Sequence, residues 1–199
     1  MSEPVKKVPA AMDIAEFLAW DAPGNERWQL VDGQPQAMAP ASRTHGVIQA
    51  ELVKLIGTHL DEQASPCTVV DAAGVIPRVQ SDSNIRIPDL AVTCSQTQVE
   101  EYAIDEPVLL VDILSPSNRS ETWINVWAYT TIPSVNEILV VDSTRIRAEL
   151  LRRDSRDNWP ERPLEIMSDG MVELQSIDFR VPLAALYRRT RLAARTAAP

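Results

Sequence analysis

The sequence predicts an α/β protein in which helices flank a mixed β-sheet and a β-hairpin precedes the sheet. Residues 85–92 and 108–114 are rich in aliphatic and β-branched side chains and are bounded by turn formers, which is typical of buried strands. Residues 47–60 carry apolar side chains at helical spacing. Strands and helices that alternate in this order indicate a sheet covered by helices.

One domain accounts for the length and the composition. The chain has 199 residues, of which 45% are hydrophobic, enough for one substantial core. We expect a flexible leader at residues 1–11, a single domain at 12–188 and a flexible basic tail at 189–199. No apolar run reaches the length of a membrane span, so we expect no membrane partner and a cytoplasmic location. The net charge of −9 argues against a broad nucleic-acid-binding face and leaves a local basic groove open.

The N-terminal part is predicted to form a short helix and a hairpin. Asp13 and Glu16 have the spacing of a helix start, in which each side chain caps the backbone of the other residue. Asp32 and Gly33 form the tight turn of a hairpin, because glycine supplies the positive φ that such a turn needs.

The long helix begins close to a histidine. His45 lies at its start, and Gln49 follows one turn later. His45 either points toward a site on the sheet or hydrogen-bonds the end of the helix, and a lone histidine more often does the latter. His59, near the acidic end of the helix, is expected at the surface.

The C-terminal half predicts further helices and strands. We expect a helix at 118–131, a buried strand at 137–142, a hairpin at 164–174 around Gly170 and a short helix at 182–187. In the first of these helices Ile124, Trp127 and Ala128 are expected to face inward.

The two cysteines, Cys67 and Cys94, both lie in predicted strands. They lack the spacing of a metal-binding or redox pair, and no histidine is near them in sequence. We therefore expect reduced core residues rather than ligands or a disulfide.

Two acidic residues lie inside predicted buried strands. Asp89 follows Pro88 in one strand, and Asp112 lies within the next. A carboxylate in a buried strand is costly unless a partner compensates its charge, and two carboxylates on neighbouring strands repel each other. A divalent cation between Asp89 and Asp112 would remove both penalties, and carboxylate oxygens suit Mg²⁺ or Mn²⁺.

Each acid also has a purely structural interpretation. Asp89 could end its strand, since it follows a proline. Asp112 could accept backbone hydrogen bonds or pair with an arginine such as Arg86. Most acidic residues in any protein are structural or solvated.

Several short motifs follow one another at characteristic spacing. They are Gln29-Leu30-Val31-Asp32-Gly33, Ala39-Pro40-Ala41-Ser42 with His45, Arg86-Ile87-Pro88-Asp89, Val111-Asp112-Ile113-Leu114-Ser115-Pro116-Ser117, and Ala128-Tyr129 before Ile132-Pro133-Ser134. In this order they resemble the Uma2 family, a group of restriction-endonuclease-like proteins. The resemblance covers residues 12–188, nearly the whole domain.

The resemblance implies a restriction-endonuclease-like PD-(D/E)xK nuclease core and a Mg²⁺- or Mn²⁺-dependent endonuclease that hydrolyses DNA phosphodiester bonds. In such a core Asp89 is the first metal-binding acid and Asp112 the second, and the carbonyl of Ile113 completes the set. His45 and Gln49 are then candidates for side chains that orient these ligands. The family usually has glutamate at the position of Asp112, so the shorter side chain reaches less far.

The chain departs from the family pattern at the catalytic lysine. The residue two positions after Asp112 is Leu114, and the alternative family position on the following helix is Asn125. Asparagine can orient water but carries no charge to stabilise a developing oxyanion. Arg119 could supply positive charge, yet it stays protonated and is a poor general base. The glutamate usual in the hairpin strand is replaced by Gln29.

Three functions are compatible with these residues. The first is a divalent-metal-dependent endonuclease, either fully active or impaired by the missing lysine. The second is a catalytically inactive protein of the nuclease fold that binds nucleic acid or associates with itself as a homodimer, which Asn125 and the net acidity favour. The third is an unrelated metal-dependent hydrolase of small molecules. A fold by itself does not decide among them.

Overall fold

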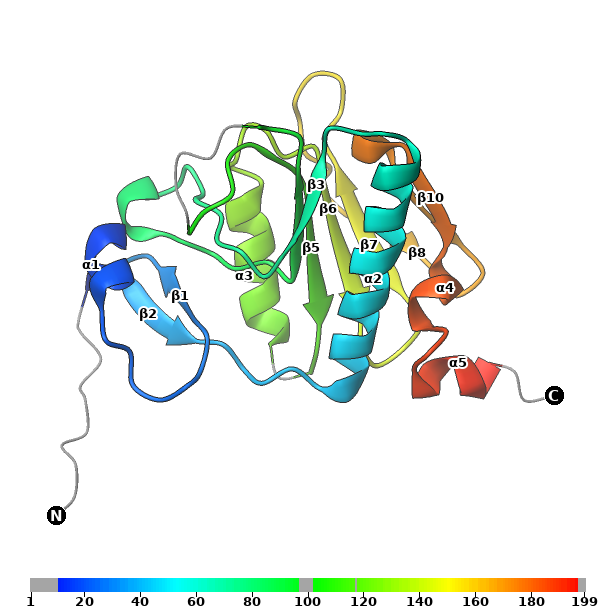
Figure 1. Ribbon diagram of the computed structural model, residues 1–199, viewed down its shortest axis with the longest axis horizontal. Coiled ribbons are helices and arrows are strands. Elements are labelled where there is room, and N and C mark those ends of the chain that lie inside the picture. Colours follow the sequence, from blue (N-terminus) through cyan, green and yellow to red (C-terminus); the bar gives the residue numbers. More distant parts are fainter. Residues whose placement is uncertain (1–10, 97–101, 117, 197–199) are drawn as a thin grey trace, which may run out of the picture.

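The computed structural model describes residues 11–96, 102–116 and 118–196. Its centre is a six-stranded mixed sheet. The strands of this sheet are, in spatial order, β3 (Thr68–Asp71), β4 (Leu90–Thr93), β5 (Pro107–Leu114), β6 (Glu137–Asp142), β7 (Ala148–Arg152) and β8 (Leu164–Ile166). Helix α2 (Arg43–Glu62) covers one face and α3 (Arg119–Tyr129) covers the other (Figure 1).

The remaining elements lie on either side of this sheet (Figure 1). They are α1 (Ile14–Ala19), β1 (Trp28–Val31), β2 (Gln34–Ala37), the 3-10 turns η1 (Ser81–Ser83) and η2 (Gln175–Ile177), β9 (Met171–Leu174), β10 (Phe179–Pro182), α4 (Leu183–Tyr187) and α5 (Arg191–Thr196). The predicted fold class, a mixed sheet flanked by helices with an N-terminal hairpin, is confirmed.

Strand β5 lies inside the sheet, and its side chains alternate between the two faces. It runs parallel to β6, while the other strand pairs of this sheet are antiparallel. Val111 and Ile113 pack in the core under α2, and Leu110 and Leu114 pack in the core under α3. The alternation therefore places Asp112 on the α3 face, between two leucines.

The predicted hairpin is formed by β1 and β2. Asp32 and Gly33 have φ values of 49° and 78°, the positive angles that a two-residue type I′ turn requires. Leu30 of β1 pairs with Ile85 through an isolated bridge, which attaches the hairpin to the segment leading into β4. Met12 completes a small core with these two residues under α1.

Helix α1 has the predicted start. Asp13 Oδ1 accepts from the Glu16 backbone amide at 2.8 Å, and Glu16 Oε2 accepts from the Asp13 amide at 3.0 Å. This reciprocal cap supplies acceptors for two amides that the helix leaves unpaired. Residues 1–10 of the expected leader, Ser117 of the family motif and residues 197–199 of the expected tail lie outside the described residues.

The hairpin expected at residues 164–174 is wrong. β8 pairs with β7 in the large sheet, whereas β9 pairs with β10 in a separate two-stranded sheet. Ile166 of β8 and Val172 of β9 are both buried in the core under α2. Each strand therefore buries its apolar side chains, but its partner is not the neighbouring strand in the sequence.

The expected flexible tail begins with a helix instead. Helix α5 follows α4 after a turn at residues 188–190, and Leu192 is buried in the core under α2. Glu51, itself buried in α2, forms ion pairs with Arg188 and Arg189 just before α5. The start of the tail thus packs against the domain.

His59 is only partly exposed, so its expected position at the surface is corrected. Its Nε2 lies 2.9 Å from the Ile177 carbonyl oxygen, and its ring packs edge-on against Phe179. The second histidine of the chain therefore joins α2 to the C-terminal strands and lies outside the site described below.

The prediction of reduced cysteines is also wrong, because Cys67 and Cys94 form a disulfide. Cys67 precedes β3 and Cys94 follows β4. Antiparallel pairing places Thr68 opposite Thr93. Cys67, one residue before Thr68, therefore faces Cys94, one residue after Thr93. In the part of the chain that the structure describes, no helix has the length and hydropathy to cross a membrane.

Candidate active site

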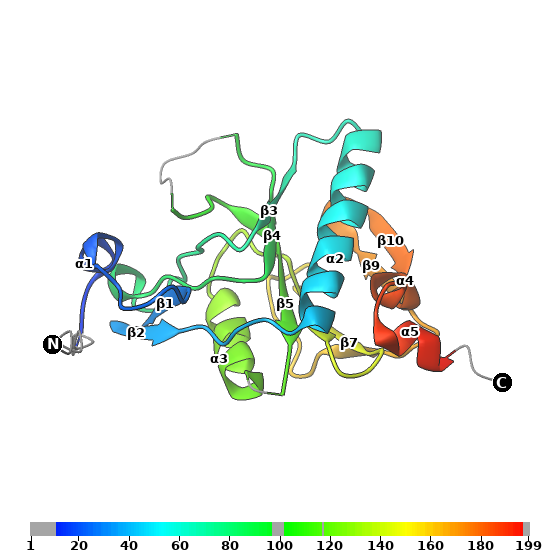
Figure 2. The ribbon, with the colours of Figure 1, turned by 60° about the horizontal axis from the view of Figure 1, so that its bottom comes forward.

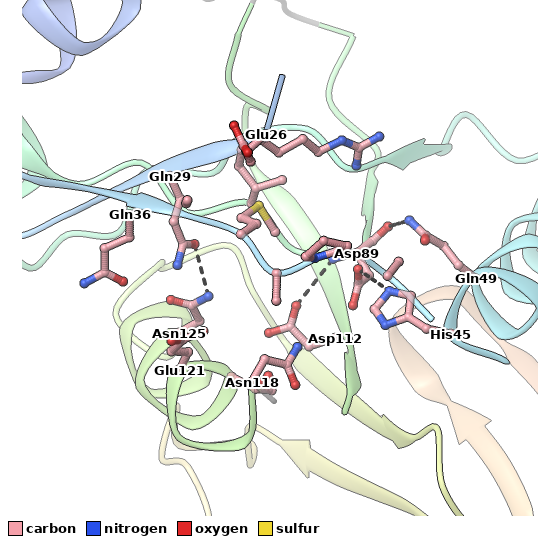
Figure 3. A pocket seen from close by; sticks show the side chains of 18 of the residues that line it. Glu26, Gln29, Gln36, His45, Gln49, Asp89, Asp112, Asn118, Glu121 and Asn125 are labelled. Carbon is pink, nitrogen blue, oxygen red and sulfur yellow. Dashed lines mark hydrogen bonds and ion pairs between the residues drawn. The ribbon is translucent and has the colours of Figure 1, made fainter. Parts of the chain in front are cut away.

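A pocket of about 470 Å³ opens between the hairpin, the start of α2 and helix α3 (Figure 3). His45, Gln49, Asp89, Asp112 and Asn125 line it, so the fold brings these predicted site residues together. The connection from β2 to α2, whose path Figure 2 shows, contributes residues 38–41 to the wall.

Asp89 lies one residue before β4 rather than inside a strand. Its Oδ1 lies 2.9 Å from His45 Nε2, and its Oδ2 accepts from the Ile113 backbone amide at 2.6 Å. Its carbonyl oxygen accepts from Gln49 Nε2 at 2.9 Å, and the same Gln49 nitrogen donates to Asp71 Oδ1 at 2.5 Å. Both side chains expected to orient the ligands, His45 and Gln49, therefore contact Asp89. His45 points at the site, although its backbone amide is also capped by Ser42.

Asp112 lies inside β5 and is 6% exposed. Its Oδ1 accepts from the Asp89 backbone amide at 3.4 Å, and its buried Oδ2 has no hydrogen-bond partner among the described residues. Burial, and after it the charge of Asp89, raises the pKa of Asp112 well above the usual range of a carboxyl group. The expected alternative of an Asp112–Arg86 ion pair does not occur. Asp112 is thus a buried acid that the described protein leaves partly unsatisfied.

Tyr129, at the end of α3, lies beside Asp112. It is completely buried, and burial followed by the charges of Asp112 and Asp89 raises its pKa well above the usual value. The Tyr129 hydroxyl lowers the pKa of Asp112 as a nearby donor does, yet no hydrogen bond of normal geometry joins the two side chains. Tyr129 therefore remains protonated and faces a carboxylate oxygen that has room for another partner.

Asn125, which the family resemblance places at the lysine position, is held from two sides. Its Oδ1 accepts from Arg86 Nη1 at 3.0 Å, and its Nδ2 donates to Gln29 Oε1 at 3.1 Å. Arg86 is 2% exposed and lies 3.6 Å from Asp32 Oδ1. Burial lowers the pKa of Arg86, and the neighbouring Asp32 opposes that change. The positive charge closest to Asn125 is thus a buried arginine from the segment before β4.

Arg119, the other cation considered from the sequence, is turned away from the paired acids. Its Nη2 lies 3.8 Å from Asp142 Oδ2, and Arg145 Nε holds the same oxygen at 2.9 Å. Sequence reasoning overlooked Arg86 as a partner of Asn125 and overlooked Tyr129 as a neighbour of Asp112. Both residues belong to the motifs that carry the resemblance, which is the signal that could have singled them out.

The donor set fits a divalent cation in part. A cation would give the unpartnered Asp112 Oδ2 a ligand bond. It would also compensate the charge of the adjacent Asp89, which together with burial raises the pKa of Asp112. Carboxylate oxygens suit Mg²⁺ or Mn²⁺. Among the described residues, however, no three His, Cys, Asp or Glu side chains gather closely enough to hold a metal ion by themselves. A cation here would rely on the two carboxylates, with further ligands from main-chain carbonyl groups, water or substrate.

The fold and the paired acids define the class: a restriction-endonuclease-like α/β protein with a carboxylate-lined pocket. The model of the Uma2 family, described as "Putative restriction endonuclease", matches residues 14–181, and the chain belongs to this family. The uncharacterized protein slr1290 of Synechocystis sp. (strain ATCC 27184 / PCC 6803 / Kazusa) is 28% identical over 175 residues, which cover 87% of this chain and 90% of that protein.

A solved structure supports the fold. The crystal structure of a protein from Anabaena variabilis ATCC 29413, described as "a putative nuclease belonging to DUF820", matches with a TM-score of 0.71 and 15% sequence identity. The match covers 88% of this chain and 97% of that chain. At this identity the likeness concerns the fold alone.

Proposed function

We propose that this protein is a divalent-metal-dependent endonuclease that hydrolyses phosphodiester bonds in DNA. The observation that carries the proposal is the buried Asp112, whose Oδ2 lacks a partner in the described part of the chain while Asp89 lies against the same side chain. Such a pair is costly without a cation, and the family description supports nuclease chemistry. A DNA substrate would place the protein in the cytoplasm.

The side chains divide the work. Asp89 and Asp112 would hold Mg²⁺ or Mn²⁺ together with the carbonyl of Ile113. The bound ion would polarise a phosphate oxygen and lower the pKa of a bound water. His45 and Gln49 fix the rotamer and the backbone of Asp89 through the bonds described above, which keeps its oxygens in place for a ligand. Asn125 would orient water or substrate in the pocket.

Plasmid nicking tests this proposal directly. Wild type with Mg²⁺ or Mn²⁺ should convert supercoiled plasmid to the nicked form, and EDTA should stop the reaction. Asp112→Asn should lower the rate by roughly a hundredfold or more, because the variant loses a ligand charge but keeps the shape of the side chain. Asp169→Asn, which changes an exposed turn carboxylate, is the matched control and should cleave normally. Full activity of a folded Asp112→Asn variant, or activity that survives EDTA, would refute the proposal.

A second candidate is a nuclease-fold protein without catalysis, which binds DNA or a second copy of itself. Asn125 at the lysine position favours it. The expectation that Ile124 and Trp127 face inward is wrong, because they are 55% and 49% exposed, whereas Ala128 is buried. These two side chains would be available for self-association. Metal-independent DNA affinity that falls with added salt, without any cleavage, would favour this candidate.

A further inference from the structure

Arg86 is a buried cation with few partners. Its guanidinium carries only one hydrogen bond within 3.5 Å, from Nη1 to Asn125 Oδ1, and its buried Nε has no partner in the described part of the chain. The carboxylate paired with it, Asp32, lies 3.6 Å away and is itself 56% exposed. The Arg86 charge is thus buried while its counter-ion is half exposed to solvent, and a buried charge acts on its surroundings because little solvent screens it.

The charge is connected to the pocket by two amides in series. Arg86 donates to Asn125 Oδ1, and Asn125 Nδ2 donates to Gln29 Oε1. The Asn125 amide accepts through its oxygen from Arg86 and donates through its nitrogen to Gln29. The series of hydrogen bonds therefore runs in one direction, from Arg86 toward Gln29. Both amide side chains line the pocket that contains Asp89 and Asp112 (Figure 3).

The final amide group has a free end. Gln29 Oε1 is occupied by Asn125, whereas Gln29 Nε2 makes no hydrogen bond to any described residue. Hydrogen bonds in a chain polarise one another, and a chain that starts at a cation strengthens its last donor. Gln29 therefore offers an N–H donor from the hairpin wall of the pocket.

We propose that Arg86, Asn125 and Gln29 form a relay by which the buried guanidinium stabilises an anionic oxygen in the pocket through the Gln29 amide. In this arrangement Gln29 contacts the phosphoryl oxygen, while Arg86 is a positioning residue that acts through Asn125. None of the described residues that line the pocket is a lysine that could supply electrostatic stabilisation. The relay supplies this stabilisation from the hairpin side. The inference rests on the proposed endonuclease function.

The experiment compares amide removal inside and outside the pocket on the same hairpin. Gln29→Met keeps the length of the side chain but removes the terminal donor. Gln34→Met makes the same change at an exposed position of β2 that does not line the pocket. Plasmid nicking with Mg²⁺ gives kcat and KM for each folded variant.

The relay predicts a fall in kcat of roughly tenfold to a hundredfold for Gln29→Met with less than about a threefold change in KM, because the donor acts mainly on charge that develops during reaction. Gln34→Met should match wild type. Arg86→Met should share the kcat defect, and Arg86→Lys, which keeps a charged donor, should recover part of it. If Arg86→Met does not fold, Gln29→Met decides.

Failure of the inference and failure of the proposed function give different results. A wild type that cleaves nothing with either Mg²⁺ or Mn²⁺ overturns both. A wild type that cleaves, together with a folded Gln29→Met variant of wild-type kcat or with a defect only in KM, overturns the relay alone.

Discussion

Asn125 Nδ2 donates to Gln29 Oε1 at 3.1 Å, and this bond joins two of the positions where the chain departs from the pattern that the family resemblance implies. The resemblance to the Uma2 family implies a lysine at the position of Asn125 and a glutamate at that of Gln29. Here two neutral amides meet instead. Relative to the implied lysine and glutamate, the two replacements leave the net charge of the pair at zero.

Restoring only the lysine should disturb the site. Asn125→Lys removes the acceptor of Arg86 and brings an ammonium next to a buried guanidinium, so we expect a loss of about 1–3 kcal/mol in the free energy of unfolding. Gln29→Glu/Asn125→Lys provides the missing negative charge and should recover most of that loss. Urea unfolding of wild type, the two single variants and the double variant gives the coupling energy.

The same variants test whether the missing lysine limits cleavage. Plasmid nicking should increase at least about tenfold in the double variant if a lysine stabilises the transition state better than the amides do. A coupling energy near zero, with equal activity in all four proteins, would show that these positions act independently.

Stability should depend on pH through Asp112. Its pKa is raised in the folded protein, so between the ordinary value of about 3.9 and the folded value the unfolded chain is ionised while the folded chain keeps the proton. Stability without metal should therefore fall as pH rises through this window. Asp112→Asn removes the ionisation and should be more stable than wild type at pH 8 by about 1–3 kcal/mol, with the gap closing near pH 4.

Urea unfolding in EDTA over this pH range measures the difference, and Asp169→Asn provides the control for loss of an exposed carboxylate. A wild type that gains stability relative to Asp112→Asn as pH rises would mean that Asp112 is well compensated as an anion.

Substitution of the two histidines should have different effects, one on metal binding and the other on stability. His45 Nε2 contacts Asp89 Oδ1, so His45→Ala should weaken Mn²⁺ binding by roughly tenfold to a hundredfold. His59 contacts Ile177 and Phe179 away from the pocket, so His59→Ala should lower the melting temperature but leave Mn²⁺ affinity unchanged. Equal Mn²⁺ affinities for the two variants would remove His45 from the site.

The disulfide should contribute to stability at one edge of the sheet. Cys67 and Cys94 are separated by 27 positions, and closing a loop of this size stabilises a fold by about 2–4 kcal/mol. Reducing agent should therefore lower the melting temperature of wild type. Cys67→Ser/Cys94→Ser should melt at that lower temperature with or without reductant, and a wild type indifferent to reductant would show that the bond is not formed in solution.

The fold was predictable where the signal is local. Asp32 and Gly33 specify a tight turn, the apolar side chains of α2 repeat at helical spacing, and β5 is a short continuous apolar run. The partners of β8 and β9 were not predictable, because both strands are short and bury apolar residues in the same core. The disulfide was missed because strand register, and not cysteine spacing, brings its two residues together.

The site was predictable in part. Proline before Asp89 and the aliphatic strand around Asp112 mark the two acids, and the start of the long helix adds His45 and, one turn later, Gln49. The amide relay could not be predicted, because Arg86 lies 39 positions before Asn125, which lies 96 positions after Gln29. Only the packing of the hairpin beside α3 brings these residues together.

The most direct measurement is a calorimetric titration with Mn²⁺ in the presence of a short DNA duplex, which can supply phosphate ligands. Wild type should bind Mn²⁺, and both Asp89→Ala and Asp112→Ala should lose that binding while their circular dichroism spectra stay like that of wild type. Equal Mn²⁺ binding by wild type and by both folded variants, or no binding by wild type, would contradict a metal site built from Asp89 and Asp112.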